Sequence, residues 1–106
     1  MVEKILTEAG FVKDETYAET QFNTPPRTTY AVFSDSFTRR GADGLNLIKD
    51  HTYTIEVYFE WPDPETEKKI EAIFDKYGIE FDKGDRYWIQ AEQMYQVVYT
   101  FNFIEK

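Results

Sequence analysis

The sequence predicts an α+β domain in which two helices pack on one face of a single, mainly antiparallel sheet of about four to five strands. Three observations favour this fold. Two segments, residues 51–60 and 95–104, alternate apolar and polar residues as half-buried strands do. Two others, near the N-terminus and after residue 63, repeat apolar residues at helical spacing. Between the first two predicted strands, residues 36–50 show neither period.

The first helix is predicted at the N-terminus, and the first strand at residues 28–34. Gly10 is placed to end this helix. The apolar stripe of the helix has the spacing i, i+3, i+4 and i+7, at Val2, Ile5, Leu6 and Ala9. Residues 11–24 show no clear pattern, and Pro25 with Pro26 then excludes a helix before the strand.

Residues 36–50 are predicted to form a long loop or an extended hairpin arm between the first two strands. The segment is rich in arginine, glycine, aspartate and asparagine, and connections of this length are uncommon unless they serve a function. The clearest strand of the chain follows at residues 51–60. One of its faces is expected to lie in the core, with Tyr53, Ile55, Val57 and Phe59.

The second helix is predicted to begin after Asp63. This carboxylate suits the N-cap, Pro64 suits the first helical position, and Glu65 and Glu67 suit the positive end of the helix dipole. Gly78 is placed to end the helix. The apolar stripe of the helix consists of Ile70, Ile73, Phe74 and Tyr77.

Three further strands are predicted at residues 79–81, 87–90 and 95–104, with a turn at residues 82–85. Seven aromatic side chains of the predicted strands are expected to pack under the helix. They are Tyr53, Phe59, Tyr87, Tyr95, Tyr99, Phe101 and Phe103. Stacking on RNA is the less favoured interpretation, because basic residues are missing beside these aromatics.

Length and charge limit the classes of function. A chain of 106 residues supports one domain, spanning residues 1–106. Its 20 acidic and 12 basic residues give a net charge of -8, which repels nucleic acid and anionic membranes and favours protein partners. The lack of cysteine excludes disulfides and thiolate chemistry. Without an apolar run suited to a signal or a membrane span, we expect a cytoplasmic protein.

No combination of residues predicts catalysis, a cofactor or a metal site. His51 is the single histidine and is expected to be an ordinary strand-end residue, because no spacing typical of a metal site surrounds it. The carboxylates of the second helix are expected to form a solvated face on which Glu65 and Lys69 pair. They are Asp63, Glu65, Glu67, Glu71 and Asp75.

A protein interface is the site that the sequence favours. Arg39 and Arg40 are adjacent arginines in an acidic chain, and they fit either an interface or a solvated loop. Trp61 and Trp88 fit either the core or an exposed interface anchor. The candidate interface residues are Phe37, Arg39, Arg40, Asp43, Leu45, Leu47, Ile48, Trp61 and Trp88.

The order of several short motifs resembles a known family. They are Pro25-Pro26, TYAVFSD at 29–35, GADG at 41–44, YTIEVY at 53–58, DPE at 63–65, YGI at 77–79, the stretch 88–94 and YQVVYTF at 95–101. From about residue 24 onward, this series is similar to tail-terminator, or tail-completion, proteins of long-tailed bacteriophages and prophages of Gram-positive bacteria. The region 14–19 and the bulky Phe22 have no counterpart in the resemblance.

The resemblance implies a structural protein without enzymatic activity. Such proteins form a ring, commonly of six subunits, that caps the tail tube and presents a surface to the head. The implied partners are further copies of the chain, the tail tube protein and the head connector or stopper protein, without sequence-specific nucleic acid and without membrane. A monomer in isolation is compatible with this role. The implied location is the host cytoplasm during assembly and the tail of the mature virion.

Two other classes of function stay open. The chain could be a small acidic inhibitor of a host protein, although many carboxylates are balanced by nearby lysines and arginines. It could also be a small enzyme that uses Asp35, Asp43 or Glu92 as acid and base, but nothing in the sequence marks a nucleophile.

Overall fold

The computed structural model describes the backbone of residues 1–40 and 48–105, and the side chains of residues 1–36 and 50–104. The fold is α+β, with two helices and a mostly antiparallel sheet of six strands. In chain order the elements are α1 (Val2–Glu8), β1 (Tyr17–Glu19), β2 (Tyr30–Arg40), β3 (Ile48–Phe59), α2 (Pro64–Lys76), β4 (Phe81–Lys83), β5 (Tyr87–Ile89) and β6 (Met94–Glu105). The predicted α+β class with two helices and a mainly antiparallel sheet is confirmed, but the prediction of four to five strands was too low.

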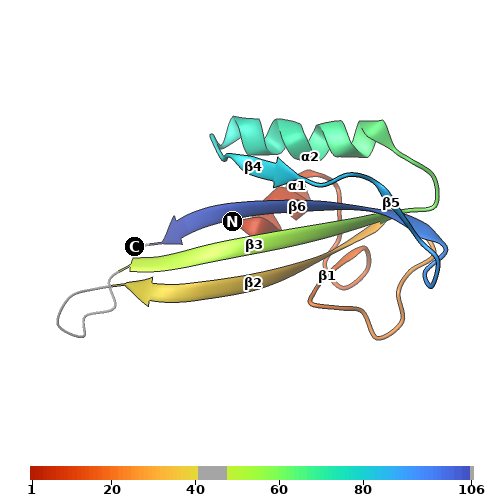
Figure 1. Ribbon diagram of the computed structural model, residues 1–106, viewed down its shortest axis with the longest axis horizontal. Helices are drawn as coiled ribbons and strands as arrows, with labels where there is room; N and C mark the ends of the chain where they lie inside the picture. The colour runs from red at the N-terminus through yellow and green to blue at the C-terminus, as the bar shows by residue number, and fades with distance from the viewer. Residues whose placement is uncertain (41–47, 106) are drawn as a thin grey trace.

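Three long strands, β2, β3 and β6, form the centre of the sheet (Figure 1). The strand order is β1-β2-β3-β6-β4, and β5 also pairs with β6. Only the pairing of β1 with β2 is parallel, and it covers β2 solely from Ala31 to Phe33. Figure 1 shows the ends of the three long strands extending along the long axis beyond the end of α2. The molecule is therefore elongated, measuring 50 × 30 × 23 Å.

The main core joins both helices to alternate residues of the long strands. The largest fully buried side chains of this core come from α1, α2, β3 and β6, and they are Ile5, Leu6, Ile55, Val57, Phe59, Ile70, Phe74, Val97 and Tyr99. Phe74 of α2 packs with Phe81 at a ring-centroid distance of 4.6 Å and meets Phe101 edge-on at 5.1 Å. Aromatic pairs of this kind contribute about 1 kcal/mol each beyond the burial of their area.

A second, smaller cluster is formed by strand residues that alternate with those of the main core and point to the other face of the sheet. It consists of Tyr30, Val32 and Met94, with Phe22 and Tyr58 packed against them. Tyr30 and Tyr58 are paired across β2 and β3, and their rings stack at 4.8 Å. Since successive side chains of a strand point to opposite faces, this cluster lies on the face that does not contribute to the main core.

The start and end of α2 follow the predicted signals. The Asp63 carboxylate accepts a hydrogen bond from the Thr66 backbone N–H at 3.2 Å and another from the Thr66 hydroxyl at 2.7 Å. Gly78 has a φ of 65°, which glycine adopts at little cost and which ends the helix. The backbone N–H of Ile79 then donates to the Phe74 carbonyl at 2.9 Å. Residue 79 thus belongs to the helix cap, and the strand predicted at 79–81 lies at Phe81–Lys83 instead.

For residues 36–50 the sequence left a long loop or an extended hairpin arm open, and the described residues form the hairpin. Residues 36–40 and 48–50 belong to β2 and β3, whose backbones pair in register as far as Arg40 opposite Ile48. Their polar side chains hide the strand period, while the ladder satisfies their backbone groups. The strand β1 was missed, because three residues are too short to show a period. Tyr17 nevertheless lies in the core, 6.2 Å from the Phe33 ring.

The aromatic residues divide between core and surface. Tyr53, Phe59, Tyr99 and Phe101 are buried in the main core as predicted, and Phe103 is partly buried against it. The prediction was wrong for Tyr87, which is 59% exposed. It was also wrong for Tyr95, because the start of β6 lies beside β5 rather than under α2, as Figure 1 shows. Tyr95 instead belongs to the site described next.

Candidate interaction surface

The candidate interface residues fall at two opposite ends of the sheet. Trp61 lies two residues after the end of β3 and Trp88 lies in β5, whereas Arg39 and Arg40 pair with the first residues of β3. The 12 residues of β3 separate the two ends, which at ~3.3 Å per residue is roughly 35 Å. We call residues 37–40 of β2 and 48–50 of β3 the arginine end, and of the remaining candidates Phe37 and Ile48 belong to it. Asp43, Leu45 and Leu47 fall outside the described residues.

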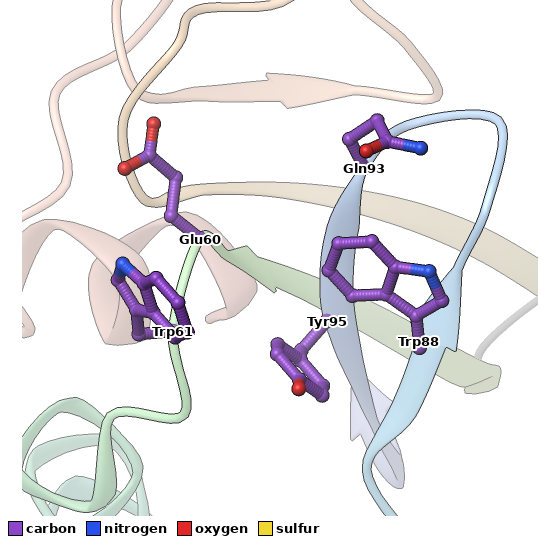
Figure 2. A pocket seen from close by; sticks show the side chains of 5 residues that line it. All are labelled: Glu60, Trp61, Trp88, Gln93 and Tyr95. Atoms are coloured by element: carbon purple, nitrogen blue, oxygen red, sulfur yellow. The ribbon is translucent and has the colours of Figure 1, made fainter.

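The tryptophan end is hollowed. A cavity of about 540 Å³ is lined by five residues, Glu60, Trp61, Trp88, Gln93 and Tyr95, which together we call the tryptophan hollow. Figure 2 shows Trp61 and Trp88 on either side of this space, with Tyr95 between them and Glu60 beside Trp61. Trp61 is 75% exposed and Trp88 is 46% exposed. Both side chains therefore lie at the surface, which excludes the core interpretation.

Pairing between strands holds the hollow in place. Tyr95 is opposite Phe59 of β3 on one side and Trp88 of β5 on the other. The rings of Trp88 and Tyr95 meet edge-on at 5.1 Å. The hairpin that joins β5 to β6 turns at Gln93, which has a φ of 55° and whose side-chain amide donates to the Gln90 carbonyl at 3.0 Å. The two tryptophans thus stand on paired strands and short connections.

The hollow is suited to holding a partner by contact with aromatic faces. Two indole rings offer large apolar faces together with N–H donors, a combination that is enriched where protein partners bind most strongly. Glu60 adds a carboxylate and also lines two neighbouring hollows. One of these contains Arg27 and the other contains both Arg27 and Glu92. The tryptophan end is therefore an aromatic surface with carboxylates at its margin.

Removal of the tryptophans is expected to cost little folding stability. For Trp61→Ala we expect a change within about 0.5 kcal/mol, because its side chain is mostly in solvent. For Trp88→Ala we expect a loss of about 1 kcal/mol, because the edge contact with Tyr95 disappears. Thermal unfolding followed by circular dichroism measures both changes. A loss of about 3 kcal/mol or more in Trp61→Ala would mean that this residue belongs to the core.

His51 differs from its predicted role as a strand-end residue. It lies inside β3, is 8% exposed, and its Nδ1 is 2.9 Å and 3.0 Å from the two carboxylate oxygens of Asp35. Its ring stacks on Tyr53 at 5.2 Å. Because Asp35 and His51 stand on neighbouring strands, the pair ties β2 to β3 on the approach to the arginine end. In the described residues, no group of three or more potential ligands is arranged to hold a metal ion.

Glu67 was predicted on a solvated helix face, but its carboxylate is almost fully buried. Arg86 donates to it from Nε at 2.7 Å and from Nη2 at 3.1 Å, and Lys83 donates at 2.8 Å. Burial alone would raise the pKa of Glu67, but the hydrogen bonds from Arg86 and Lys83 outweigh it and lower the pKa. The spacing of Glu67 with Ile70 and Phe74, i, i+3 and i+7, was the sequence signal for its place on the buried stripe.

The Glu67 cluster joins α2 to the segment that leads to the hollow. Lys83 also donates to Glu71 at 2.7 Å, and the Tyr99 hydroxyl donates to the same Glu71 oxygen at 2.8 Å. Burial raises the pKa of Tyr99, so its hydroxyl stays a donor. Arg86 precedes β5 directly. The cluster thereby anchors the chain just before Trp88, and it supports the hollow without lining it.

Comparison with known proteins does not assign the chain to a family. No protein-family model matches it, and no curated protein matches it with significance. Neither helix of the described residues is long and apolar enough to cross a membrane.

Proposed function

We propose that this chain is a structural protein of a long-tailed bacteriophage or prophage, which caps the tail tube as an oligomeric ring and provides the head-joining surface. The observation that carries the proposal is the order and spacing of the motifs between residues 25 and 101, which resemble those of tail-terminator proteins. Its partners are other copies of the chain, the tail tube protein and the head connector or stopper protein. It acts in the host cytoplasm during assembly and in the tail of the virion.

The shape of the subunit supports this proposal. A ring needs two different contact surfaces on each subunit, because each copy binds one neighbour on either side. The tryptophan hollow and the arginine end are two such surfaces, roughly 35 Å apart on one stiff sheet. The proposal includes both helices packed on one face of the sheet, an arrangement supported by their shared buried cluster. On the opposite face, the part beyond the cluster of Tyr30, Val32 and Met94 is accessible to a neighbour, and it includes the exposed Thr52 and Asn102.

The role is assembly, and no catalytic step is part of it. Of the two described carboxylates that the sequence offers as acid and base, Asp35 is bound to His51 near the arginine end, and Glu92 lies beside the tryptophan hollow. Asp35 is paired with Tyr53 midway along β2 and β3, whereas Glu92 lies before the start of β6, so the two carboxylates do not form one site. A charge of -8 per subunit also makes nucleic acid an unfavourable partner.

Deletion of the gene from the phage or prophage that encodes the chain tests the proposal. We expect heads and tails that fail to join and tails of irregular length, since tube growth is no longer stopped. Negative-stain electron microscopy measures both, and a tagged chain is expected at the head-proximal end of the wild-type tail. Normal infectious particles without the chain would refute the role. Absence from particles together with capture of one host protein would instead support the acidic inhibitor.

A further inference from the structure

We propose that the tryptophan hollow of one copy binds the arginine end of a second copy, in a head-to-tail contact. The arginine end consists of residues 37–40 of β2 and residues 48–50 of β3. The inference deepens the proposed ring by naming the two surfaces that meet. Its test uses purified protein alone, so it can fail while the role in the phage tail stands.

The two surfaces lie too far apart to meet within one molecule. Arg40 is paired with Ile48 at the start of β3, and Trp61 comes just after the end of this strand. The separation of roughly 35 Å is held by a three-stranded ladder that pairs β2, β3 and β6 along nearly their whole length. In Figure 1 the two ends of β3 lie far apart along the long axis. Any contact between them therefore needs another molecule.

The charges of the two ends are complementary. The whole chain carries -8, yet at the arginine end the three cations Arg39, Arg40 and Lys49 outnumber the two carboxylates, which are Asp50 and the neighbouring Glu105 of β6, opposite Lys49. In the sheet register Arg39 is opposite Lys49, so the cations stand at neighbouring positions. The tryptophan end places Glu60 and Glu92 at its surface with one guanidinium, Arg27. A second copy thus carries the charge that the hollow lacks.

The chemistry of the hollow favours a guanidinium group in particular. Arginine binds flat on the faces of tryptophan and tyrosine and forms two parallel hydrogen bonds with a carboxylate. Trp61, Trp88 and Tyr95 offer such faces around one space, and Glu60 lies next to Trp61 (Figure 2). When two copies are joined in this way, the pair still has one unoccupied tryptophan hollow and one unoccupied arginine end. Further copies can therefore add until the assembly closes into a ring.

Tryptophan fluorescence can measure this contact directly, because the only two tryptophans of the chain, Trp61 and Trp88, both line the hollow. The emitting protein carries Arg39→Glu and Arg40→Glu, so its hollow is intact but its arginine end is reversed. The added protein carries Trp61→Ala and Trp88→Ala, so it has an intact arginine end and no tryptophan emission. The matched control carries all four substitutions. Circular dichroism checks each fold, and phenylalanine replaces alanine if the alanine variant is misfolded.

We expect the added protein to shift the emission in a saturable way at concentrations up to about 1 mM, and the four-substitution control to do so at least ~10-fold more weakly. Rising salt should weaken the shift, because partly exposed charges are screened. Glu60→Lys in the emitting protein should also weaken it. The mixture should form pairs and no larger species by analytical ultracentrifugation, since each variant keeps one working surface.

Two results would overturn the inference. One is an equal shift with the added protein and with the four-substitution control, which would mean that the arginines do not contribute. The other is no shift at about 1 mM, because even a contact with a Kd of about 1 mM would be half formed at that concentration. If either result occurs while the chain is still found at the head-proximal end of the tail, the proposed function stands and the ring uses other surfaces.

Discussion

Replacement of Val57 by aspartate is expected to unfold most of the domain. Val57 is fully buried in β3, between Ala31 of β2 and Val97 of β6, which are themselves fully buried. An aspartate there brings a charge into the core without a cationic partner in the neighbouring strand positions, so we expect a loss of about 4 kcal/mol or more. Domains of this size are stable by ~5–15 kcal/mol in total. Urea unfolding followed by circular dichroism measures the loss.

Thr52→Asp is the matched control for Val57→Asp. Thr52 lies on the same strand, but its side chain points to the opposite face of the sheet and is exposed. The same substitution there is expected to change the free energy of unfolding by less than about 1 kcal/mol. Tyr99→Asp, in a fully buried position of β6, should behave like Val57→Asp. Wild-type stability of both core variants would contradict the assigned faces of β3 and β6.

Glu67→Ala is expected to destabilise the domain by about 2–3 kcal/mol. The substitution leaves Lys83 without one of its two carboxylate partners and Arg86 without its carboxylate, and it removes a buried group that accepts three hydrogen bonds. Both cations are partly exposed and can return to water, which keeps the loss below that of a fully buried pair. Glu65→Ala, on the exposed side of α2, is the control and should change little. Urea unfolding of the two variants measures the difference.

The same cluster makes stability depend on pH in a definite direction. The pKa of Glu67 is lower in the folded chain than in the unfolded chain, because Arg86 and Lys83 favour its charged form. Its contribution is therefore complete above the ordinary glutamate pKa, and it is lost as the pH falls through the lower, folded value. Glu67→Gln should show a flatter loss of stability in acid than the wild type. Equal slopes in the two proteins would mean that Glu67 does not drive this dependence.

The long elements of the fold could be predicted from the sequence because their signals are local. The alternation from Tyr53 to Phe59 and the cap at Asp63 each act within one segment, and the structure contains both as expected. The strand β1 could not be found in this way. Its three residues form a strand because Tyr17 and Ala18 pack against β2, and this pairing depends on residues 14 positions away in the chain.

The candidate site could be predicted only in part. Trp61 and Trp88 were predicted as candidate interface residues, but whether they are exposed could not be predicted. Their exposure depends on where the second helix and β5 pack, and no local sequence pattern indicates this packing. The sequence also placed the tryptophans and arginines in one predicted interface. The register of β2, β3 and β6 separates them to opposite ends. Glu60, Gln93 and Tyr95 were missed for the same reason, since only the pairing of strands brings them together.

The short length of β1 leaves an open edge on the sheet. β1 pairs with β2 only as far as Phe33, and no other described strand continues that edge toward Arg40. The Ala31 N–H and the Phe33 carbonyl point to the β1 side, so by alternation the backbone groups of Asp35, Phe37 and Arg39 point the same way. A row of backbone N–H and C=O groups at a sheet edge can pair with a strand of another molecule and so lead to aggregation. Charged residues along the edge oppose this pairing. Asp35, Arg39 and Arg40 supply such charges. The two arginines that are proposed to join copies in a defined contact thus also oppose disordered aggregation along this edge.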